Sequence, residues 1–277
     1  MVASTRPGAD PAVAQASPSR WRAWASFVVR HGKARLAALG LTLGLGLGAA
    51  LLALYLFAAL ADTVMDEETT RIDYGVLAAL RAVQSPELDR LAYVVSALGA
   101  EILAVLMVVL LILFGWQRRW GAVVSLLVVV VGAQMLNNVL KDWFHRTRPA
   151  PLEGLIPAQA FSFPSGHAMV AAAFYLFVGY LAWQILTGRT RIVCAEFLVM
   201  VALLIGLSRL YLGVHYLTDV MAGYIAGVAW TDAVIIGGHL LARRRLTRAG
   251  APAPPPLTAS AETSSSPRLQ PEQPSPA

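Results

Sequence analysis

Six long apolar runs constrain this 277-residue chain more than any other feature of its sequence. The first run, residues 36–61, contains no charged residue at all. About 20 apolar residues are enough for an α-helix to cross the hydrocarbon core of a bilayer. The chain is 57% hydrophobic and 14% charged, whereas about a quarter of the residues are charged in an ordinary soluble domain. We therefore expect an all-α membrane protein rather than a soluble domain.

The spacing of the runs predicts a helical bundle. The six predicted spans are residues 36–61, 91–116, 120–140, 168–188, 192–208 and 220–242. Between the first two, Ile72, Val76 and Leu80 recur at helical spacing among charged residues, which predicts a short amphipathic helix at the membrane interface. The expected fold is a bundle of six transmembrane helices with this interfacial helix between spans one and two, in one domain over residues 36–242.

The two ends of the chain differ from this domain in composition. They are rich in Ala, Ser and Pro and cannot bury an apolar core, so residues 1–35 and 243–277 are expected to be largely disordered. Lys and Arg favour cytoplasmic loops, and 15 of the 22 lie on the same side as the two termini. We therefore expect both termini in the cytoplasm. The loops 141–167 and 209–219 then face outward from the cell (inner) membrane.

Three short motifs lie at these two outer loops. In chain order they are K-x6-R-P at 141–149, P-S-G-H at 164–167 and S-R-x5-H-x3-D at 208–219. Lys141, Arg148 and Arg209 supply three cations, and the guanidinium fork of Arg matches the oxygens of a phosphate. We interpret them as a cage for an oxyanion. Because no cluster of acidic residues and histidines in these loops resembles a divalent-metal site, we expect no metal and no cofactor.

The other motif residues suggest a nucleophile and a proton donor. Ser165 and Gly166 stand directly before the fourth span, where the free N–H groups of a helix N-terminus favour an anion. His215 and Asp219 are four residues apart and are expected to share a face of the helix that starts the sixth span. The carboxylate can then hold one imidazole nitrogen while the other attacks phosphorus. His167 offers a second imidazole that can protonate the leaving oxygen.

Taken together, the motifs resemble those of the type 2 phosphatidic acid phosphatase superfamily of integral membrane lipid phosphatases. The resemblance covers about residues 36–242 and implies a six-helix bundle with metal-independent hydrolysis through a phosphohistidine on His215. It also implies that Asp219 orients His215 and that His167 is the general acid, which makes these three the candidate catalytic residues. The residues that it implies for phosphate binding are Lys141, Arg148, Ser165, Gly166 and Arg209.

The predicted function is removal of the terminal phosphate from a membrane lipid phosphate or diphosphate at the outer leaflet. The candidate substrates are phosphatidic acid, phosphatidylglycerol phosphate and a polyprenyl diphosphate such as undecaprenyl diphosphate. A lipid phosphotransferase, which passes the phosphoryl group to a lipid hydroxyl, is an alternative that the motifs do not separate from a phosphatase. A transporter is disfavoured because no span is broken near its midpoint by Gly and Pro. Beyond the substrate and the bilayer we expect no nucleic-acid partner, and the oligomeric state is open.

Three further residues near the first motif have open roles. His145 and Arg146 lie at unconstrained positions inside K-x6-R-P, and each could contact substrate or be an ordinary loop residue. Asn137 lies one helical turn before Lys141, so it could support the site or pack between helices.

Overall fold

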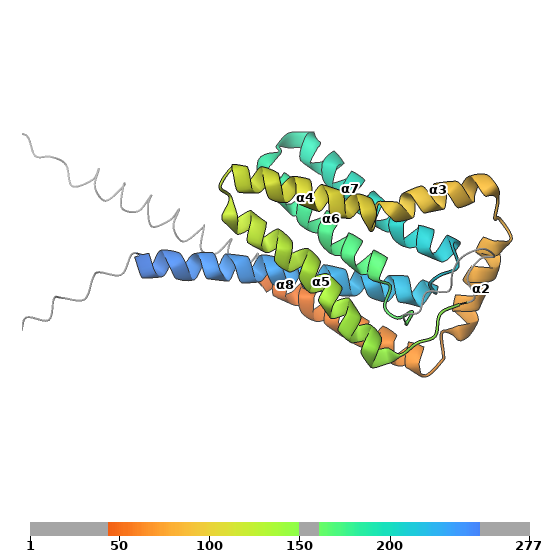
Figure 1. Cartoon of the computed structure of the whole chain (residues 1–277). Helices are drawn as coiled ribbons and strands as arrows, with labels where there is room; N and C mark the ends of the chain where they lie inside the picture. The colour runs from red at the N-terminus through yellow and green to blue at the C-terminus, as the bar shows by residue number, and fades with distance from the viewer. Residues whose placement is uncertain (1–43, 150–160, 250–277) are drawn as a thin grey trace, which may run out of the picture. The chain divides into compact units, whose positions relative to one another are not determined.

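The computed structural model of the protein describes residues 44–149 and 161–249, which are helical and contain no strand. The first helix, Gly44–Met65, is followed by α2 (Thr70–Arg81), α3 (Pro86–Ala97), α4 (Glu101–Trp116), α5 (Trp120–Phe144), α6 (Gly166–Ile185), α7 (Gly188–Tyr211) and α8 (Leu217–Ala249) (Figure 1). The predictions of disorder for the two chain ends fall largely outside the described residues.

Within those ranges, six helical stretches are long and apolar enough to cross a membrane, which confirms the predicted number of spans. They are Gly44–Met65, Pro86–Trp116, Trp120–Phe144, Gly166–Ile185, Gly188–Tyr211 and Leu217–Ala242. The second stretch comprises α3 and α4 and begins earlier than predicted, because Ser85 caps α3 by accepting the backbone N–H of Leu88. The all-α, six-span fold class is therefore correct, with helices that extend further toward the motifs than the apolar runs indicate.

The helix α2 occupies the place of the predicted amphipathic helix, and it also carries a buried carboxylate that the prediction did not include. Asp73 is 0% exposed and Leu77 is 3% exposed, whereas Ile72, on the predicted apolar face, is 60% exposed. A buried carboxylate requires polar partners to offset the loss of its hydration. The burial of Asp73 therefore indicates that α2 makes a polar contact with the bundle. The location of α2 at a membrane interface stays a prediction.

The helix α6 is central to the bundle (Figure 1). Nine of its residues are buried. Its apolar neighbours come from four other helices and include Leu103 of α4, Leu126 of α5, Ile205 of α7 and Ala226 of α8. A helix that is apolar on all sides is typical of such a position. The first turn of α6, which carries the P-S-G-H motif, is thus held from several directions.

Close packing of α8 against α6 joins the second and third motifs. A Cβ atom on Gly223 would lie 2.6 Å from the carbonyl oxygen of Ser165, and one on Gly227 would lie 2.5 Å from that of Met169. Small residues four apart let two membrane helices approach at backbone distance. At the end of this contact, the backbone N–H of Ser165 donates to the carbonyl oxygen of Asp219 at 2.9 Å.

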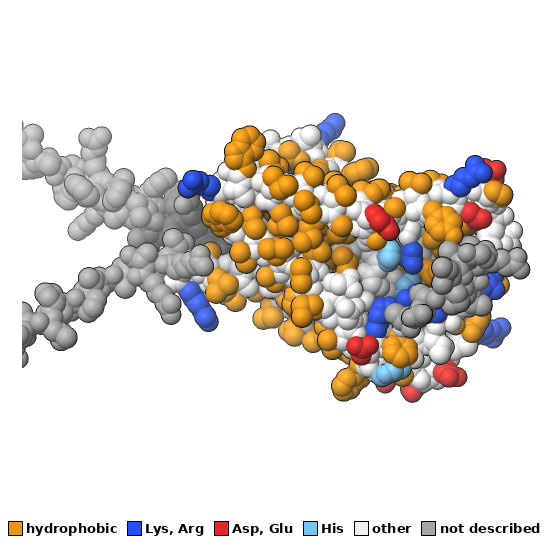
Figure 2. Space-filling model, viewed as in Figure 1, with side chains coloured by type: hydrophobic (Ala, Val, Ile, Leu, Met, Phe, Trp, Pro, Cys, Tyr) orange, Lys and Arg blue, Asp and Glu red, His pale blue; other side chains and the backbone are white. Residues whose placement is uncertain are grey.

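Polar side chains gather at one end of the bundle. Figure 2 shows acidic, histidine, Lys and Arg side chains together at the end where α2 lies, while apolar side chains cover most of the visible side of the other helices. At this end α5 and α7 finish and α6 and α8 begin (Figure 1). The three motifs, which lie far apart in the sequence, therefore meet there.

Candidate active site

The eight predicted site residues all lie at or beside these helix ends. In chain order they are Lys141 in the last turn of α5, Arg148 in the segment after it, Ser165 as the N-cap of α6, Gly166 and His167 in the first turn of α6, Arg209 in the last turn of α7, His215 before α8, and Asp219 in the first turn of α8. Several residues predicted to lie in loops are thus fixed on helices. Their positions depend on helix packing rather than on loop conformation.

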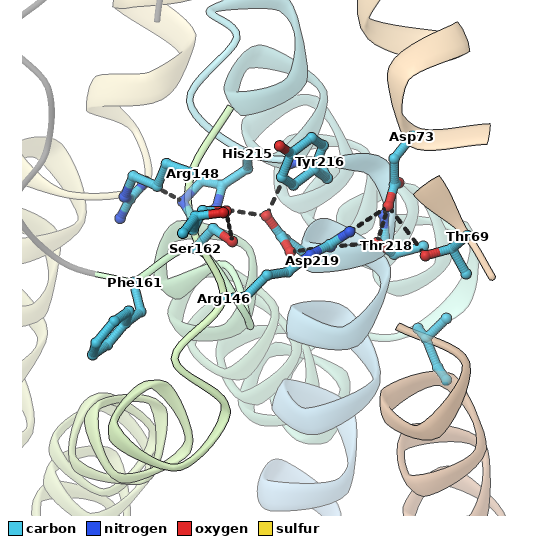
Figure 3. A network of polar contacts seen from close by, with 12 residues as sticks. Thr69, Asp73, Arg146, Arg148, Phe161, Ser162, His215, Tyr216, Thr218 and Asp219 are labelled. Carbon is cyan, nitrogen blue, oxygen red and sulfur yellow. Dashed lines mark hydrogen bonds and ion pairs between the residues drawn. The ribbon is translucent and has the colours of Figure 1, made fainter. Parts of the chain in front are cut away.

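His215 is contacted on both sides of its ring (Figure 3). Its Nδ1 lies 3.4 Å from Oδ2 of Asp219, and its Nε2 lies 3.2 Å from Nη1 of Arg148. Because a guanidinium only donates hydrogen bonds, we assign the proton to Nδ1 and the lone pair to Nε2. Burial lowers the pKa of His215 to about 4, so the imidazole is neutral at neutral pH. A neutral imidazole with its lone pair on Nε2 is the form that can attack phosphorus.

The contact between His215 and Asp219 arises differently from the prediction. The sequence interpretation placed both residues on one face of α8, and this was wrong, because α8 begins at Leu217 and His215 precedes it. Asp219 instead reaches back, and its Oδ2 also accepts the backbone N–H of Tyr216 at 2.9 Å. An acidic or amide side chain in the first helical turn often caps the helix in this way. Helix capping, rather than helix-face spacing, brings the two side chains together.

The three cations of the motifs converge on His167, and two of them, Arg148 and Lys141, also interact with His215. Electrostatic interactions connect His167 with Arg209, His215, Arg148 and Lys141. Like charges held this closely repel one another, and a bound anion relieves the repulsion. In the part of the chain that the structure describes, no group of three or more His, Cys, Asp or Glu residues could hold a metal ion. The positive charge that these motifs bring to the site is therefore supplied by Arg and Lys side chains.

Two buried donor groups of this cage, on Arg209 and Ser165, have no hydrogen-bond partner among the residues that the structure describes. Arg209 donates from Nη1 to Oγ of Ser96 at 2.6 Å, but its buried Nε has no hydrogen-bond partner among the described residues. The buried hydroxyl of Ser165 likewise has none among them. An unsatisfied buried polar group costs about 1–3 kcal/mol, which a ligand oxygen would recover. Lys141 differs, since its Nζ donates to the carbonyl oxygen of Phe161 at 2.6 Å.

The backbone of the P-S-G-H turn departs from the prediction at one position. The N–H of Ser165 donates to the carbonyl oxygen of Asp219, so it is not free to bind an anion as expected. The N–H groups of Gly166 and His167 come next, and the first N–H groups of an α-helix have no partner within the helix. The anion-binding backbone of this turn therefore begins at Gly166.

Asn137 supports this turn from α5. Its side chain is fully buried, and its Nδ2 donates to the carbonyl oxygen of Pro164 at 3.2 Å. Its Oδ1 lies 2.9 Å from the place that a Cβ on Gly166 would take, so any larger residue at position 166 would push the amide of Asn137 aside. Of the two roles that the sequence leaves open for Asn137, the structure favours support of the site.

Arg146 is the residue whose importance the sequence interpretation missed. It does not join the cage, because its Nη1 and Nη2 donate to Asp219 and Asp73, each at 2.7 Å. Burial alone would lower the pKa of Arg146, but these two carboxylates outweigh it and raise the pKa. The neighbouring His145 is exposed, with its ring against Phe161. In the sequence, the only sign of this role is Asp73, an acidic residue on the predicted amphipathic helix. A single sequence does not show that Asp73 pairs with Arg146.

Comparison with known proteins identifies the family. A family model described as the PAP2 superfamily matches residues 122–239. The chain is 32% identical over 178 residues to phosphatidylglycerophosphatase B of Bacillus subtilis, a match that covers 62% of this chain and 86% of that protein. It is 30% identical over 151 residues to an undecaprenyl-diphosphatase of Sulfolobus acidocaldarius, covering 52% of this chain and 68% of the other.

A solved structure shares the fold. The crystal structure of a transmembrane PAP2-type phosphatidylglycerolphosphate phosphatase from Bacillus subtilis matches with a TM-score of 0.64 and 29% sequence identity, over 69% of this chain and 96% of that one. The chain therefore belongs to the PAP2 superfamily and is an integral membrane protein. The resemblance inferred from the three motifs is confirmed.

Proposed function

We propose that the protein removes the terminal phosphate of a membrane lipid phosphate or diphosphate without a metal ion, through a phosphohistidine on His215. Membership of the PAP2 superfamily makes the protein a lipid phosphatase, that is, a phosphoric monoester or diphosphate hydrolase. The observation that carries the residue assignment is the environment of His215. Its ring is buried and neutral, Asp219 holds Nδ1, and Nε2 faces the cations of the cage.

In the first half-reaction, Nε2 of His215 attacks phosphorus and the bond from phosphorus to the leaving oxygen breaks. The phosphate replaces Nε2 of His215 as the hydrogen-bond partner of Arg148, which leaves Nε2 free to attack. Arg148, Lys141 and Arg209 then stabilise the charge on the phosphoryl oxygens. The phosphorylated imidazole carries a positive charge and keeps its proton on Nδ1. This N–H donates a hydrogen bond to the carboxylate of Asp219. His167, protonated once the bound phosphate offsets the charge of the surrounding cations, gives its proton to the leaving oxygen, which departs as the alcohol or the lipid monophosphate.

In the second half-reaction, water attacks the phosphohistidine. His167, now neutral, accepts a proton from this water while the bond between phosphorus and Nε2 breaks. Inorganic phosphate leaves, His215 regains its lone pair and His167 is protonated again. The same two histidines thus complete the cycle, and the reaction consumes one water molecule for each phosphate released.

The substrate class follows from the position of the site. The cage lies at the ends of membrane-spanning helices, so a phosphate head group could bind there while its acyl or prenyl tail stays in the bilayer. Both the phosphatidylglycerophosphatase and the undecaprenyl-diphosphatase among the relatives are consistent with this class. We propose phosphatidic acid, phosphatidylglycerol phosphate or a polyprenyl diphosphate as the substrate. On the charge count, the site faces the outer leaflet of the cell membrane with both termini in the cytoplasm.

Phosphate release from purified lipids tests this proposal. The full chain in detergent should release inorganic phosphate from at least one member of a panel of lipid phosphates and diphosphates, in excess EDTA and without any acceptor lipid. His215→Ala should abolish the release. His145→Asn is the matched control, because His145 is exposed and lies outside the cage, and asparagine tolerates its left-handed backbone (φ 51°). Phosphoryl transfer only in the presence of an acceptor lipid would contradict the proposal and identify a phosphotransferase.

A further inference from the structure

A second polar network extends from Asp219 on the side away from Arg148 (Figure 3). Arg146 bridges two carboxylates in it, with its Nη1 2.7 Å from Oδ1 of Asp219 and its Nη2 2.7 Å from Oδ2 of Asp73. Both carboxylates are 0% exposed. Nη1 also donates to the hydroxyl of Thr218 at 2.8 Å, and the guanidinium carbon lies 4.3 Å from the ring centroid of Tyr216. Arg146 is thus held by contacts on several sides.

Asp73 connects this network to α2. Its Oδ1 accepts the backbone N–H of Thr218 at 3.1 Å, and its Oδ2 accepts the hydroxyls of Thr218 at 2.7 Å and Thr69 at 3.3 Å. The first N–H groups of a helix need partners from outside the helix. For α8 one such partner comes from α2, which lies far away in the sequence. The start of α8, and with it Asp219, is therefore positioned by α2.

We infer that Arg146 and Asp73 are positioning residues for the proposed phosphohistidine reaction, Arg146 by fixing the carboxylate of Asp219 and Asp73 by fixing Arg146. The inference rests on the proposed function, in which Asp219 orients His215. Each oxygen of Asp219 has its own partners, because Oδ1 contacts Arg146 while Oδ2 contacts Nδ1 of His215 and the N–H of Tyr216. Without Arg146, the carboxylate could rotate about its broad terminal torsion and lose this division.

Arg146 also adjusts the charge behind the nucleophile. A lone carboxylate beside His215 would stabilise the protonated imidazole, which cannot attack phosphorus. Arg146 offsets much of the negative charge of Asp219 while leaving Oδ2 as a hydrogen-bond acceptor. The charged and titratable groups that face His215 are then Asp219, Arg148, Lys141 and His167, with Arg146 behind Asp219. Loss of Arg146 should therefore shift the protonation of His215 as well as its orientation.

Steady-state kinetics of folded variants separate positioning from simple structural support. Arg146→Gln should lower kcat by about 10²-fold, the usual scale for a misplaced reacting group, while KM changes little, because Arg146 does not belong to the cage. The acid limb of the kcat/KM profile should move to higher pH. Arg146→Lys keeps the charge but not the fork, and should lose less activity than Arg146→Gln. Asp73→Asn keeps an acceptor for the N–H of Thr218 and should also lower kcat.

Two further variants control for folding. Arg146→Gln leaves Asp73 buried without its ion-pair partner, so the double variant Arg146→Gln/Asp73→Asn removes that charge and should unfold at a higher temperature than Arg146→Gln while staying slow. Arg71→Gln, on an exposed Arg of α2, is the matched control and should keep wild-type kinetics.

The possible results separate this inference from the proposed function. Wild-type kcat and an unchanged pH profile in Arg146→Lys, Asp73→Asn and the double variant would overturn the inference while leaving His215 as the nucleophile. A raised KM with unchanged kcat would also overturn it, because Arg146 would then be a substrate ligand. Activity in His215→Ala would instead contradict the proposed function itself, whatever the Arg146 variants do.

Discussion

At the scale of single residues, the two histidines of the site have different surroundings. His215 is 2% exposed and is contacted at both ring nitrogens, as a nucleophile with a fixed tautomer requires. His167 lies in the first turn of α6, is partly exposed and interacts electrostatically with the cations of the cage. This difference favours His215 as the residue that attacks phosphorus. The surrounding cations oppose a protonated His167, so we propose that His167 holds a proton for the leaving oxygen only when a bound phosphate offsets their charge.

The division of roles predicts that His167→Ala is sensitive to the leaving group. The variant should lose about 10²–10⁴-fold in kcat with an alkyl phosphate, which is the usual contribution of proton transfer. It should lose much less with an aryl phosphate whose leaving group needs no proton. Rates for a matched pair of alkyl and aryl phosphates measure this difference. An equal loss with both substrates would contradict the assignment of His167 as general acid.

The pKa of His215 predicts the acid side of the pH profile. Burial lowers this pKa to about 4 from an ordinary value of about 6.5, so the neutral nucleophile is available above about pH 4. The kcat/KM, corrected for titration of the substrate, should therefore fall only as the pH drops through about 4. Between about pH 6.5 and 4 the unfolded chain binds a proton at this residue and the folded chain does not, so its contribution to stability decreases as the pH falls. If the corrected kcat/KM instead fell as the pH drops through about 6.5, the buried environment of His215 would be contradicted.

At the scale of helices, the site is assembled by contacts that a hydropathy pattern does not contain. The sequence predicts the number of spans, the three motifs and their shared end of the bundle, because long apolar runs, charged loops and motif spacing are visible in the order of the residues. It does not predict that Asp73 is buried, because the amphipathic pattern of α2 indicates that its charged residues face water. It also places His215 on α8, because four-residue spacing suggests a helix face when the start of the helix is unknown. Both errors concern helix ends, where side-chain capping decides the structure.

The packing of α6 against α8 leads to a prediction about glycine. Gly223→Ala adds a single methyl group that would lie 2.6 Å from the carbonyl oxygen of Ser165, so the two helices have to separate. We expect a lower unfolding temperature and a reduced kcat, because Ser165 and Asp219 move apart. Gly237→Ala in the same helix is the matched control, since a Cβ there meets nothing within 4 Å. Thermal unfolding in detergent and phosphate release measure both effects, and equal behaviour of the two variants would contradict the packing argument.

At the scale of the whole molecule, the charge count predicts that the site faces outward from the membrane, and cysteine labelling can test this prediction. In a Cys194→Ala background, Glu87→Cys lies at the end of the bundle that carries the site, and Gln117→Cys lies at the turn between α4 and α5. A membrane-impermeant thiol reagent should label Glu87→Cys in intact cells and Gln117→Cys only after permeabilisation. The reverse pattern would place the site at the cytoplasmic leaflet.

The central claim is that His215 carries the phosphoryl group during turnover. Rapid quenching of the reaction with a ³²P-labelled lipid phosphate, followed by separation of the protein, tests it most directly. We predict a protein-bound phosphate that is labile to acid and stable to base, as a phosphohistidine is, in the wild type and in His145→Asn but not in His215→Ala. A phosphoenzyme that still forms in His215→Ala would contradict the account. If it forms in His215→Ala and is also absent in His167→Ala, the two roles are reversed.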